Sequence, residues 1–248
     1  MPAKTIDEVI QQLTDIVDWS INRNSRLGYF AALYRHVTIQ VKAGIGDGFF
    51  EDGERMERLD VIFANRYLDA FEQNRRNMAP TRSWQLAFEA SNQWWPIVLQ
   101  HLLLAMNAHI NLDLGIAAAR TCPGQAVQDL KVDFNKINAI LASMVDGVQK
   151  DLAEVWPMLK ILDRIGGKTD EAVINFSIDK ARDHAWRVAE DLAPLALDEQ
   201  ISRIDALDSE TVVVGRLIRR PGLMLSTANK IIRCCERGSI PQIIAMLS

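Results

Sequence analysis

Two histidines and an aspartate occur within one long apolar stretch of the chain, from Trp94 to Arg120. The stretch reads WWPIVLQHLLLAMNAHINLDLGIAAAR and contains His101, His109 and Asp113. In a helix, His109 and Asp113 are i and i+4, about 6 Å apart along the axis and about 40° apart around it, so their side chains can meet or share a ligand. A histidine oriented by a carboxylate is a candidate general acid or base.

The other polar residues of this stretch have different positions. His101 lies about 12 Å from His109 along the helix axis, too far to bind the same ion comfortably, although both rings can face one elongated cavity. Gln100, Asn107 and Asn111 form a second stripe on another side of the helix. We expect Asn107 and Asn111 to hold a neighbouring helix.

The stretch is long and apolar enough to be considered as a membrane span, which needs about 20 mainly apolar residues. An Asp near the centre of a span costs about 2.5–3.5 kcal/mol, and here it is accompanied by two His, two Asn and a Gln. A helix with this composition is instead typical of one enclosed by its neighbours. We therefore predict no membrane span, but a buried central helix over residues 96–120.

The density of polar groups in this helix has two explanations. The groups can hydrogen-bond only to one another and to neighbouring helices, as most buried polar groups do. Alternatively they form a site, and the desolvation cost of so many buried groups favours this interpretation. In an enzyme, His109 is the general acid or base, Asp113 orients it, and His101 is a second proton-transfer or substrate-binding group. Apolar walls then imply a small, largely hydrophobic substrate, and an isomerase, cyclase or lyase reaction.

A metal-dependent hydrolase is the alternative reaction class. His109 and Asp113 form an H-x-x-x-D pair of the kind that holds a divalent metal in helical phosphoesterases, and further ligands would come from Asp60, Asp69 or Asp133. The chain has no HExxH motif, serine-nucleophile elbow, Gly-rich phosphate loop or Rossmann fingerprint. A non-catalytic small-molecule-binding protein is the third possibility, so the sequence decides neither the reaction nor the need for a metal.

Composition indicates an ordinary globular protein. Of the 248 residues, 48% are hydrophobic and 24% charged, and the net charge of −4 gives no sign of a nucleic-acid partner. The basic residues near the C-terminus have helical spacing and predict a solvated helix face: Arg216, Arg219, Arg220, Lys230, Arg233 and Arg237. The oligomeric state has no signature in the sequence.

The cysteines and the first residues bear on the compartment. Cys122, Cys234 and Cys235 are odd in number and lack CxxC spacing, so we expect reduced thiols. The N-terminal MPAKTIDEVIQQL has acidic residues where a signal peptide needs an apolar run, which favours a cytoplasmic location.

Apolar residues recur with a helical period along the whole chain, which predicts an all-α fold. Thr5 to Glu8 forms a capping box, Asp52 is a candidate N-cap after the Gly44–Gly53 loop, and that loop lacks the ligand pattern of a calcium-binding EF-hand. The expected helices cover about 5–22, 25–43, 53–76, a segment from about 82 towards the tryptophans, 96–120, 132–155, a short segment from 156, and 169–194, 198–206, 209–219, 223–237 and a last turn after 241. We expect one multi-helix bundle, with residues 1–195 as the core domain and 196–248 as a helical C-terminal extension packed on it.

Four runs of the chain resemble the signature segments of a bacterial protein family known only as a domain of unknown function. The runs are GDGFFEDGERMERLDVIFANRYLDAF, QHLLLAMNAHINLDLGIA, VDFNKINAIL and DLAEVWPMLKILD, and the resemblance covers about residues 25–195. HLLLxMNAHINLDLG is its most specific part. The family usually has Gly where this chain has Ala105, which slightly closes the approach of a neighbouring helix. The resemblance implies a helical fold and no established activity.

Overall fold

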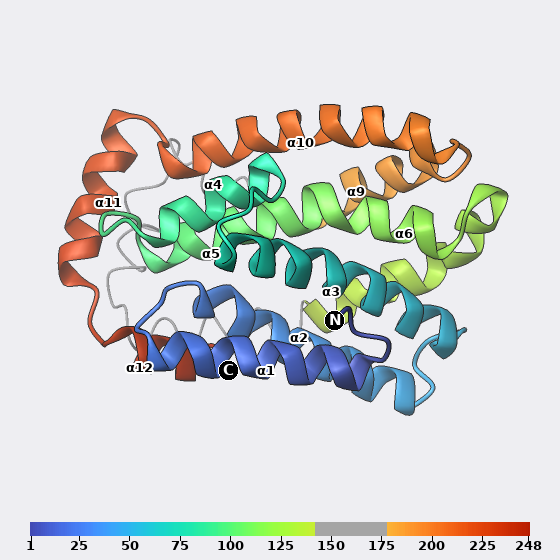
Figure 1. Cartoon of the computed structure of the whole chain (residues 1–248), viewed down its shortest axis with the longest axis horizontal. Coiled ribbons are helices and arrows are strands. Elements are labelled where there is room, and N and C mark those ends of the chain that lie inside the picture. The colour runs from blue at the N-terminus through green and yellow to red at the C-terminus, as the bar shows by residue number, and fades with distance from the viewer. Residues whose placement is uncertain (142–177) are drawn as a thin grey trace.

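Helices make up most of the part of the chain that the structure describes (Figure 1). The computed structural model describes residues 1–141 and 178–248, and these two ranges contain no β-strand, which confirms the all-α prediction. The elements are α1 (Ile6–Asn22), α2 (Gly28–Gly46), α3 (Gly53–Arg75), α4 (Arg82–Ser91), α5 (Val98–Met106), η1 (Asn107–Leu114), α6 (Gly115–Thr121), η2 (Gly124–Leu130), α9 (Ile178–Leu192), α10 (Leu197–Arg219), α11 (Leu223–Cys235) and α12 (Ile240–Met246).

Two of the predicted N-caps begin their helices as expected. The hydroxyl of Thr5 accepts a hydrogen bond from the Glu8 backbone N–H at 3.2 Å, at the start of α1. The carboxylate of Asp52 accepts one from the Arg55 backbone N–H at 2.9 Å, at the start of α3. Local sequence therefore sets where these two helices begin, because each cap satisfies a backbone donor that the helix itself leaves free.

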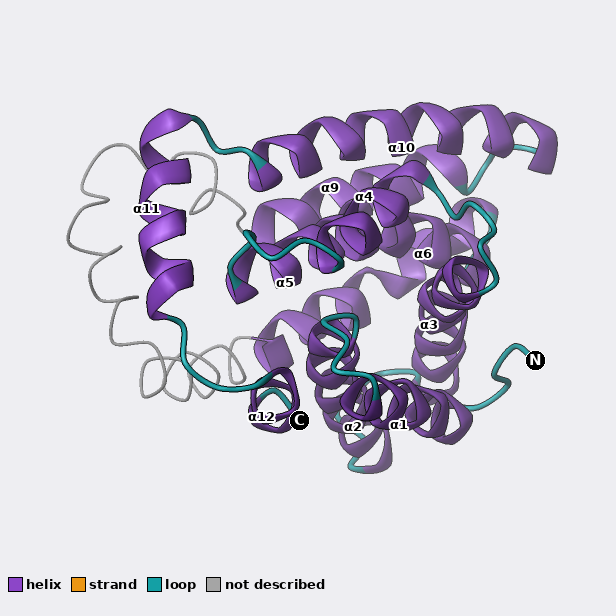
Figure 2. Cartoon of the chain, turned by 60° about the vertical axis from the view of Figure 1, so that its left-hand side comes forward, coloured by secondary structure: helices purple, strands orange, loops and turns teal. Residues whose placement is uncertain are grey.

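The N-terminal hairpin of α1 and α2 packs against the C-terminal helix α12 (Figure 2). Gly28 makes this contact possible, since a Cβ atom there would lie 2.5 Å from Ile244 Cδ1 and 2.6 Å from Ser20 Cβ. Both distances are shorter than side chains tolerate, so α12 docks where α2 has no side chain. The two ends of the chain are thus parts of one packed unit.

The predicted central helix runs without a break through α5, η1 and α6, from Val98 to Thr121. It is long and apolar enough to cross a membrane, but 83% of its most apolar window is buried within the protein, as in a core helix. Its middle third, η1, is a π-helix, which closes i→i+5 hydrogen bonds and is wider than an α-helix. The sequence predicted the helix but not its change of pitch.

The central helix is enclosed by α3, α4, α9 and α10. Its closest neighbour is α9, because a Cβ atom on Gly115 would lie 2.7 Å from the Ala185 carbonyl oxygen and 2.6 Å from Val188. The absence of a side chain at Gly115 lets the two backbones approach, so α6 is held between α3 and α9.

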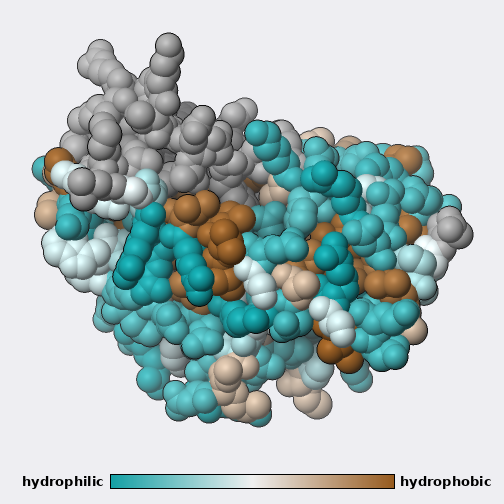
Figure 3. Space-filling view, turned by 90° about the horizontal axis from the view of Figure 1, so that it is seen from above, coloured by the Kyte–Doolittle hydropathy of each residue, from teal (hydrophilic) through white to brown (hydrophobic). Residues whose placement is uncertain are grey.

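Helix α10 corrects one prediction. Residues 198–206 and 209–219 were expected to form two helices, whereas the structure has one, Leu197–Arg219. Its outer face carries exposed apolar side chains, among them Val213 and Leu217, and its inner face carries buried ones. Figure 3 shows apolar patches among polar groups on the face of the molecule seen from above. Apolar residues on both faces weaken the periodic pattern from which a helix is recognised.

Two acidic side chains from the C-terminal part of the chain cap helices of the core. Asp208 accepts hydrogen bonds from the backbone N–H groups of Arg82 and Ser83, at 2.8 and 3.0 Å, at the start of α4. Glu236 accepts one from the Val98 N–H at 2.8 Å, at the start of α5. Residues beyond 195 therefore fix the ends of two helices that position the candidate site.

Helix predictions between residues 131 and 194 are only partly covered by the described ranges. Residues 131–141 are helical, in agreement with the start of the expected 132–155 helix. The rest of that helix, the short helix from Trp156 and the helix start at Thr169 lie outside the described residues. The end of the 169–194 prediction corresponds to α9.

Candidate functional site

The ring of His109 lies inside a group of aromatic side chains from α2, α3 and α4. Phe63 stacks on it with ring centroids 3.6 Å apart and an interplanar angle of 10°. Tyr34 approaches edge-on at 4.4 Å, and Phe30 and Trp84 follow at 5.4 and 6.0 Å. Only 3% of His109 is exposed. We call the side chains of Phe30, Tyr34, Phe63, Tyr67 and Trp84 around His109 the aromatic box.

Asp113 lies one turn beyond His109 and is fully buried. Its Oδ1 accepts a hydrogen bond from Arg66 Nε at 2.5 Å, and its Oδ2 accepts one from Trp84 Nε1 at 2.7 Å. His109 Nδ1 is 3.8 Å from the same Oδ2, beyond hydrogen-bond distance but within strong electrostatic reach. The predicted pair thus meets, and two unpredicted residues, Arg66 and Trp84, complete the environment of the carboxylate.

The pKa values of both members of this pair are lowered, but for different reasons. Burial lowers the pKa of His109, and the neighbouring Asp113 only partly offsets this, so the ring is neutral at neutral pH. Burial alone would raise the pKa of Asp113, but the Arg66 guanidinium, His109 and the Trp84 N–H together hold it below its usual value. A neutral imidazole therefore lies beside an ionised carboxylate.

Asp60 and Tyr34 add two more polar groups to the same region. Asp60 is one turn before Phe63 on α3, and its charge is among the causes that raise the pKa of the Tyr34 hydroxyl. Burial, with Glu57 nearby, raises the pKa of Asp60 to about 7. Asp60 Oδ2 and the Tyr34 hydroxyl are both buried, and neither has a hydrogen-bond partner among residues 1–141 and 178–248.

The ring nitrogens of His109, Nδ1 and Nε2, are likewise buried polar atoms without a hydrogen-bond partner among the described residues. A buried polar group without a partner costs about 1–3 kcal/mol, so such groups are rare in proteins and concentrate where a function needs them. Four unpartnered polar atoms thus occur on three neighbouring side chains: His109, Asp60 and Tyr34.

The π-helix carries the central residues of the site. η1 begins at Asn107 and ends at Leu114, so it includes both His109 and Asp113. π-helical turns are rare and are frequently found at functional sites, because the wider turn changes the direction in which side chains project. The change of pitch therefore coincides with the residues that the sequence singled out.

In the second polar stripe, Asn107 holds a neighbouring helix, as predicted, whereas the hydrogen bond of Asn111 is to Asn107 on the same helix. Asn107 Nδ2 donates to the Thr211 carbonyl of α10 at 2.9 Å, and its Oδ1 accepts from Asn111 Nδ2 at 2.9 Å. Gln100 Nε2 donates to the Ile218 carbonyl of α10 at 2.8 Å. The amides of Gln100 and Asn107 therefore bind α10 to the central helix, and His109 lies on a different side of that helix.

His101 is not part of the aromatic box. Its nearest ring is Tyr29, at 5.9 Å, whereas His109 contacts the following residue, Phe30. His101 is also buried, with 6% exposed, but no ring neighbour of His109 contacts it among the described residues. The structure thus places the two histidines in separate environments.

The proposed metal ligands are also distributed over different environments. Asp133 accepts hydrogen bonds from the backbone N–H groups of Glu51 and Asp52 and from Arg55, at 2.7, 3.0 and 3.0 Å, which gives it a structural role in holding the loop before α3. Asp69 is exposed and lies near the N-terminus. Over residues 1–141 and 178–248, no group of three or more His, Cys, Asp and Glu side chains is arranged to hold a metal ion.

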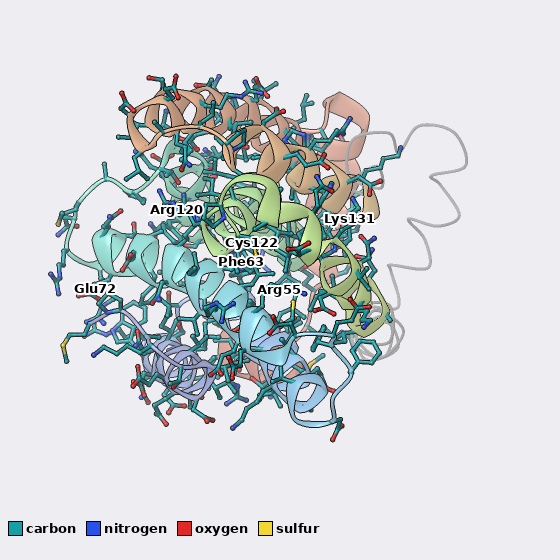
Figure 4. The ribbon with its side chains drawn as sticks, turned by 90° about the vertical axis from the view of Figure 1, so that its right-hand side faces the viewer. Arg55, Phe63, Glu72, Arg120, Cys122 and Lys131 are labelled. Atoms are coloured by element: carbon teal, nitrogen blue, oxygen red, sulfur yellow. The ribbon has the colours of Figure 1, made fainter. Side chains whose placement is uncertain are left out.

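Sequence reasoning missed most of the environment of the pair. No sequence-based prediction placed Arg66, Trp84 or Phe63 in the site. Arg66 follows Phe63 by three residues, so helical spacing places both on the side of α3 that faces the central helix. Figure 4 shows Phe63 where α3 passes beneath α6, with Arg120 and Cys122 at the end of α6. The signal that could have found Arg66 is a charged residue on an otherwise apolar helix face.

A surface hollow of about 470 Å³ lies apart from this site. It is formed by α1 and the second half of α3, and its lining includes Trp19, Glu72 and Arg75. Glu72 lies near one end of α3 and Arg55 near the other, with Phe63 between them (Figure 4). None of the residues of the aromatic box lines this hollow.

Comparison with known proteins gives a family but no activity. The model of a family of unknown function, DUF5995, matches residues 6–221. This match extends past residue 195 and includes α10, which the resemblance in the sequence had not reached. No curated protein and no solved structure matches the chain.

Proposed function

Because the chain belongs to DUF5995, whose function is unknown, the activity has to be inferred from the site; we propose that the protein is an enzyme that moves a proton on a small, largely hydrophobic molecule, with His109 as its general acid or base. The state of the His109 ring carries this proposal. The ring is buried and neutral, lies 3.8 Å from an ionised carboxylate, and has no hydrogen-bond partner on either nitrogen among the described residues.

Asp113 is the positioning residue in this proposal. Its negative charge lies on the Nδ1 side of the ring, which favours the tautomer with the proton on Nδ1 and leaves the lone pair on Nε2. When Nε2 takes a proton from a substrate, the imidazolium that forms is stabilised by Asp113. Arg66 and Trp84 keep that carboxylate ionised and in place through their two hydrogen bonds.

Asp60 and Tyr34 supply the complementary proton donors. With a pKa of about 7, Asp60 retains its proton in a large share of molecules near neutral pH, and the raised pKa of Tyr34 keeps its hydroxyl protonated. A carbonyl oxygen of the substrate would accept a hydrogen bond from one of them while His109 removes a proton from the adjacent carbon. The aromatic box favours an apolar body for this substrate, since its walls offer ring faces and edges.

The test is solvent deuterium exchange. Purified protein is incubated in D₂O with a panel of small cyclic and aromatic ketones, and deuterium incorporation next to the carbonyl is measured by mass spectrometry. We expect at least one ketone to exchange with the wild type, and His109→Gln to lose about 100-fold or more of that rate. His184→Gln is the matched control, because His184 is a half-buried histidine on α9, outside the aromatic box.

Other outcomes contradict the proposal in distinct ways. Ketones that stabilise the protein in thermal melts but never exchange favour the non-catalytic binding protein. Exchange that is lost on chelation and restored by a divalent cation favours the metal-assisted version on His109 and Asp113. A panel that neither binds nor exchanges counts against a carbonyl substrate altogether.

A further inference from the structure

Two adjacent tryptophans, Trp94 and Trp95, are exposed in the loop that joins α4 to α5. Their exposed fractions are 49% and 55%, whereas Trp84 and Trp186 are buried, as tryptophans in folded proteins mostly are. The two exposed rings meet edge to face, with centroids 4.8 Å apart and an interplanar angle of 78°. Large exposed apolar groups that lie together, unlike single ones, mark surfaces that bind another molecule.

The loop that carries this pair is held against α11, which lies at one end of the molecule (Figure 1). Arg233 Nε donates to the Trp94 carbonyl at 2.6 Å, and Arg233 Nη1 donates to Glu236 Oε2 at 2.6 Å. The other carboxylate oxygen of Glu236 accepts a hydrogen bond from the Val98 N–H at 2.8 Å, at the start of α5. The two tryptophans therefore belong to a fixed part of the fold and are not carried by a free loop.

Two cations of α11 lie over the tryptophan rings. Arg233 Cζ is 5.0 Å from the ring centroid of Trp94, and Lys230 Nζ is 5.6 Å from that of Trp95, both within the range of cation–π interactions. Ile231, which follows Lys230 on the same helix, is 55% exposed. Apolar and positive groups are therefore interleaved on this surface. We call Trp94, Trp95, Lys230 and Arg233 the tryptophan corner.

The segments that form this corner are positively charged, although the net charge of the whole chain is −4. Residues 91–112, which include both tryptophans, contain no Asp, Glu, Lys or Arg. Residues 220–248 contain four basic residues and one acidic residue, Glu236. The Glu236 side chain is 3% exposed and is paired with Arg233, so its charge lies below the surface. Positive charge is thus concentrated beside the exposed tryptophans of an acidic protein.

We propose that the tryptophan corner binds the surface of a membrane that contains anionic lipids, without spanning it. Tryptophan is enriched where a membrane meets water, because its ring is apolar and its N–H group is polar. Lysine and arginine beside the rings attract negatively charged headgroups, and each one near the membrane surface raises the affinity about fivefold. The corner combines both contributions, and it shares no residue with the aromatic box around His109.

Two other partners fit this surface less well. A second copy of the chain in a symmetric contact would bring an identical positive surface against the first, because a twofold interface uses the same patch on both subunits. Single-stranded nucleic acid binds by stacking its bases on free ring faces, but here a cation lies over each ring and the two rings contact each other. A lipid surface accepts the rings in this arrangement, because it contacts their exposed edges and carries the opposite charge.

Vesicle flotation tests the proposal with the full chain. Vesicles of equal parts phosphatidylglycerol and phosphatidylcholine are compared with vesicles of phosphatidylcholine alone, and bound protein is measured after flotation through a density gradient. We expect the protein to float with the anionic vesicles and to bind the neutral ones about tenfold more weakly or worse. Binding to the anionic vesicles should weaken as sodium chloride is added, because salt screens the attraction between exposed charges.

Trp95→Ser and Lys230→Gln separate the apolar contribution from the charge. Trp95→Ser should weaken binding to the anionic vesicles about tenfold or more, and Lys230→Gln should weaken it about fivefold. Ile201→Ser and Lys4→Gln are the matched controls, because both residues are exposed and lie outside the corner, and both variants should bind as the wild type does. Thermal melts check folding. If Trp95→Ser does not fold, Lys230→Gln combined with Arg237→Gln replaces it and should weaken binding about 25-fold.

Four results would overturn the proposal. The first is that the wild type does not float with the anionic vesicles. The second is that it binds neutral and anionic vesicles equally well. The third is that the folded variants of the corner bind the anionic vesicles as tightly as the wild type. The fourth is binding to an oligothymidine in place of vesicles, lost in Trp95→Ser, which would assign the corner to single-stranded nucleic acid.

Discussion

On one side of the central helix, the amides of Gln100 and Asn107 donate to carbonyls of α10, and Asn111 donates to Asn107. On the other side, the rings of His101 and His109 are equally buried, but within the described chain their nitrogens have no hydrogen-bond partner. Both stripes are polar residues on one apolar helix. Their tertiary environments differ completely.

This difference separates a structural role from a functional one. The amides of Gln100, Asn107 and Asn111, here called the amide stripe, form hydrogen bonds that offset the free-energy cost of burial. They therefore stabilise the packing of α10. The rings of His101 and His109, here called the histidine stripe, have no such hydrogen bonds to the described residues. This is the pattern expected where a ligand or a reacting group supplies the missing hydrogen-bond partner. Measurements that separate stability from function should therefore divide the residues of the same helix into two groups.

Asp113→Asn is expected to have the largest effect on stability. Asp113 has a structural and a functional role, since it accepts hydrogen bonds from Arg66 and Trp84 and also faces His109. An amide would leave the largely buried guanidinium of Arg66 without its counter-ion, and we expect a loss of about 3 kcal/mol in the free energy of unfolding. Urea unfolding measures this loss; a change below about 1 kcal/mol would mean that the ion pair contributes as little as an exposed one.

The pH dependence of stability tests Asp60. Its pKa of about 7 in the folded protein exceeds the unfolded value, so the folded state binds more protons between about pH 4 and 7. The contribution of Asp60 to the free energy of unfolding should therefore fall as pH rises through this range, by up to about 1.4 kcal/mol per pH unit, and level off above it. His101, His109 and Asp113, whose pKa values are lowered, contribute in the opposite direction, so the effect of Asp60 is read from the difference between the wild type and a variant without this carboxyl.

Urea unfolding at several pH values compares Asp60→Asn with the wild type. The free energy of unfolding of the wild type minus that of the variant should fall as pH rises from about 4 to 7, because only the wild type has this carboxyl group to titrate. Asp18→Asn, at an exposed position on α1, is the control and should show no such pH-dependent difference. A difference between the wild type and Asp60→Asn that does not change with pH would mean that Asp60 does not titrate in this range.

Asn107→Ala tests the amide stripe. Asn107 makes a hydrogen bond to α10 and accepts one from Asn111, so its loss removes the bond to the Thr211 carbonyl and leaves Asn111 Nδ2 without its acceptor. We expect a loss of about 2 kcal/mol in unfolding free energy, with the chemistry at His109 retained. Asn111→Ala removes only the bond between the two amides and should cost less. Equal costs for both variants would mean that the contact with α10 contributes little.

His109→Phe should have the smallest effect on stability and abolish the activity. The variant loses no hydrogen bond to the described residues and keeps an aromatic ring stacked on Phe63. We expect thermal and urea unfolding to stay within about 1 kcal/mol of the wild type. A loss as large as that of Asn107→Ala would place His109 in the structural group and remove the main support for a site.

Much of the fold followed from local sequence patterns. Helical periodicity and the caps at Thr5 and Asp52 predicted the helices and two of their starts, because these features depend on residues within one or two turns. The start of α4 was also predicted, but its cap was not, since Asp208 lies 126 positions from Arg82 in the sequence. Helix α10 was wrongly predicted as two helices, because it has apolar residues on both faces. Which of those residues are buried depends on packing against helices that are distant in the sequence.

By itself, the sequence determined that His109 and Asp113 meet, since an i,i+4 pair on a helix is close whatever surrounds it. Only the tertiary structure decided which groups surround this pair and therefore its protonation state. Arg66 and Trp84, 47 and 29 positions away, bind the carboxylate and keep it ionised, and Phe63 encloses the imidazole. Those contacts depend on how helices cross and in which register, which is set by the packing of all helices together and not by the periodicity of any one of them.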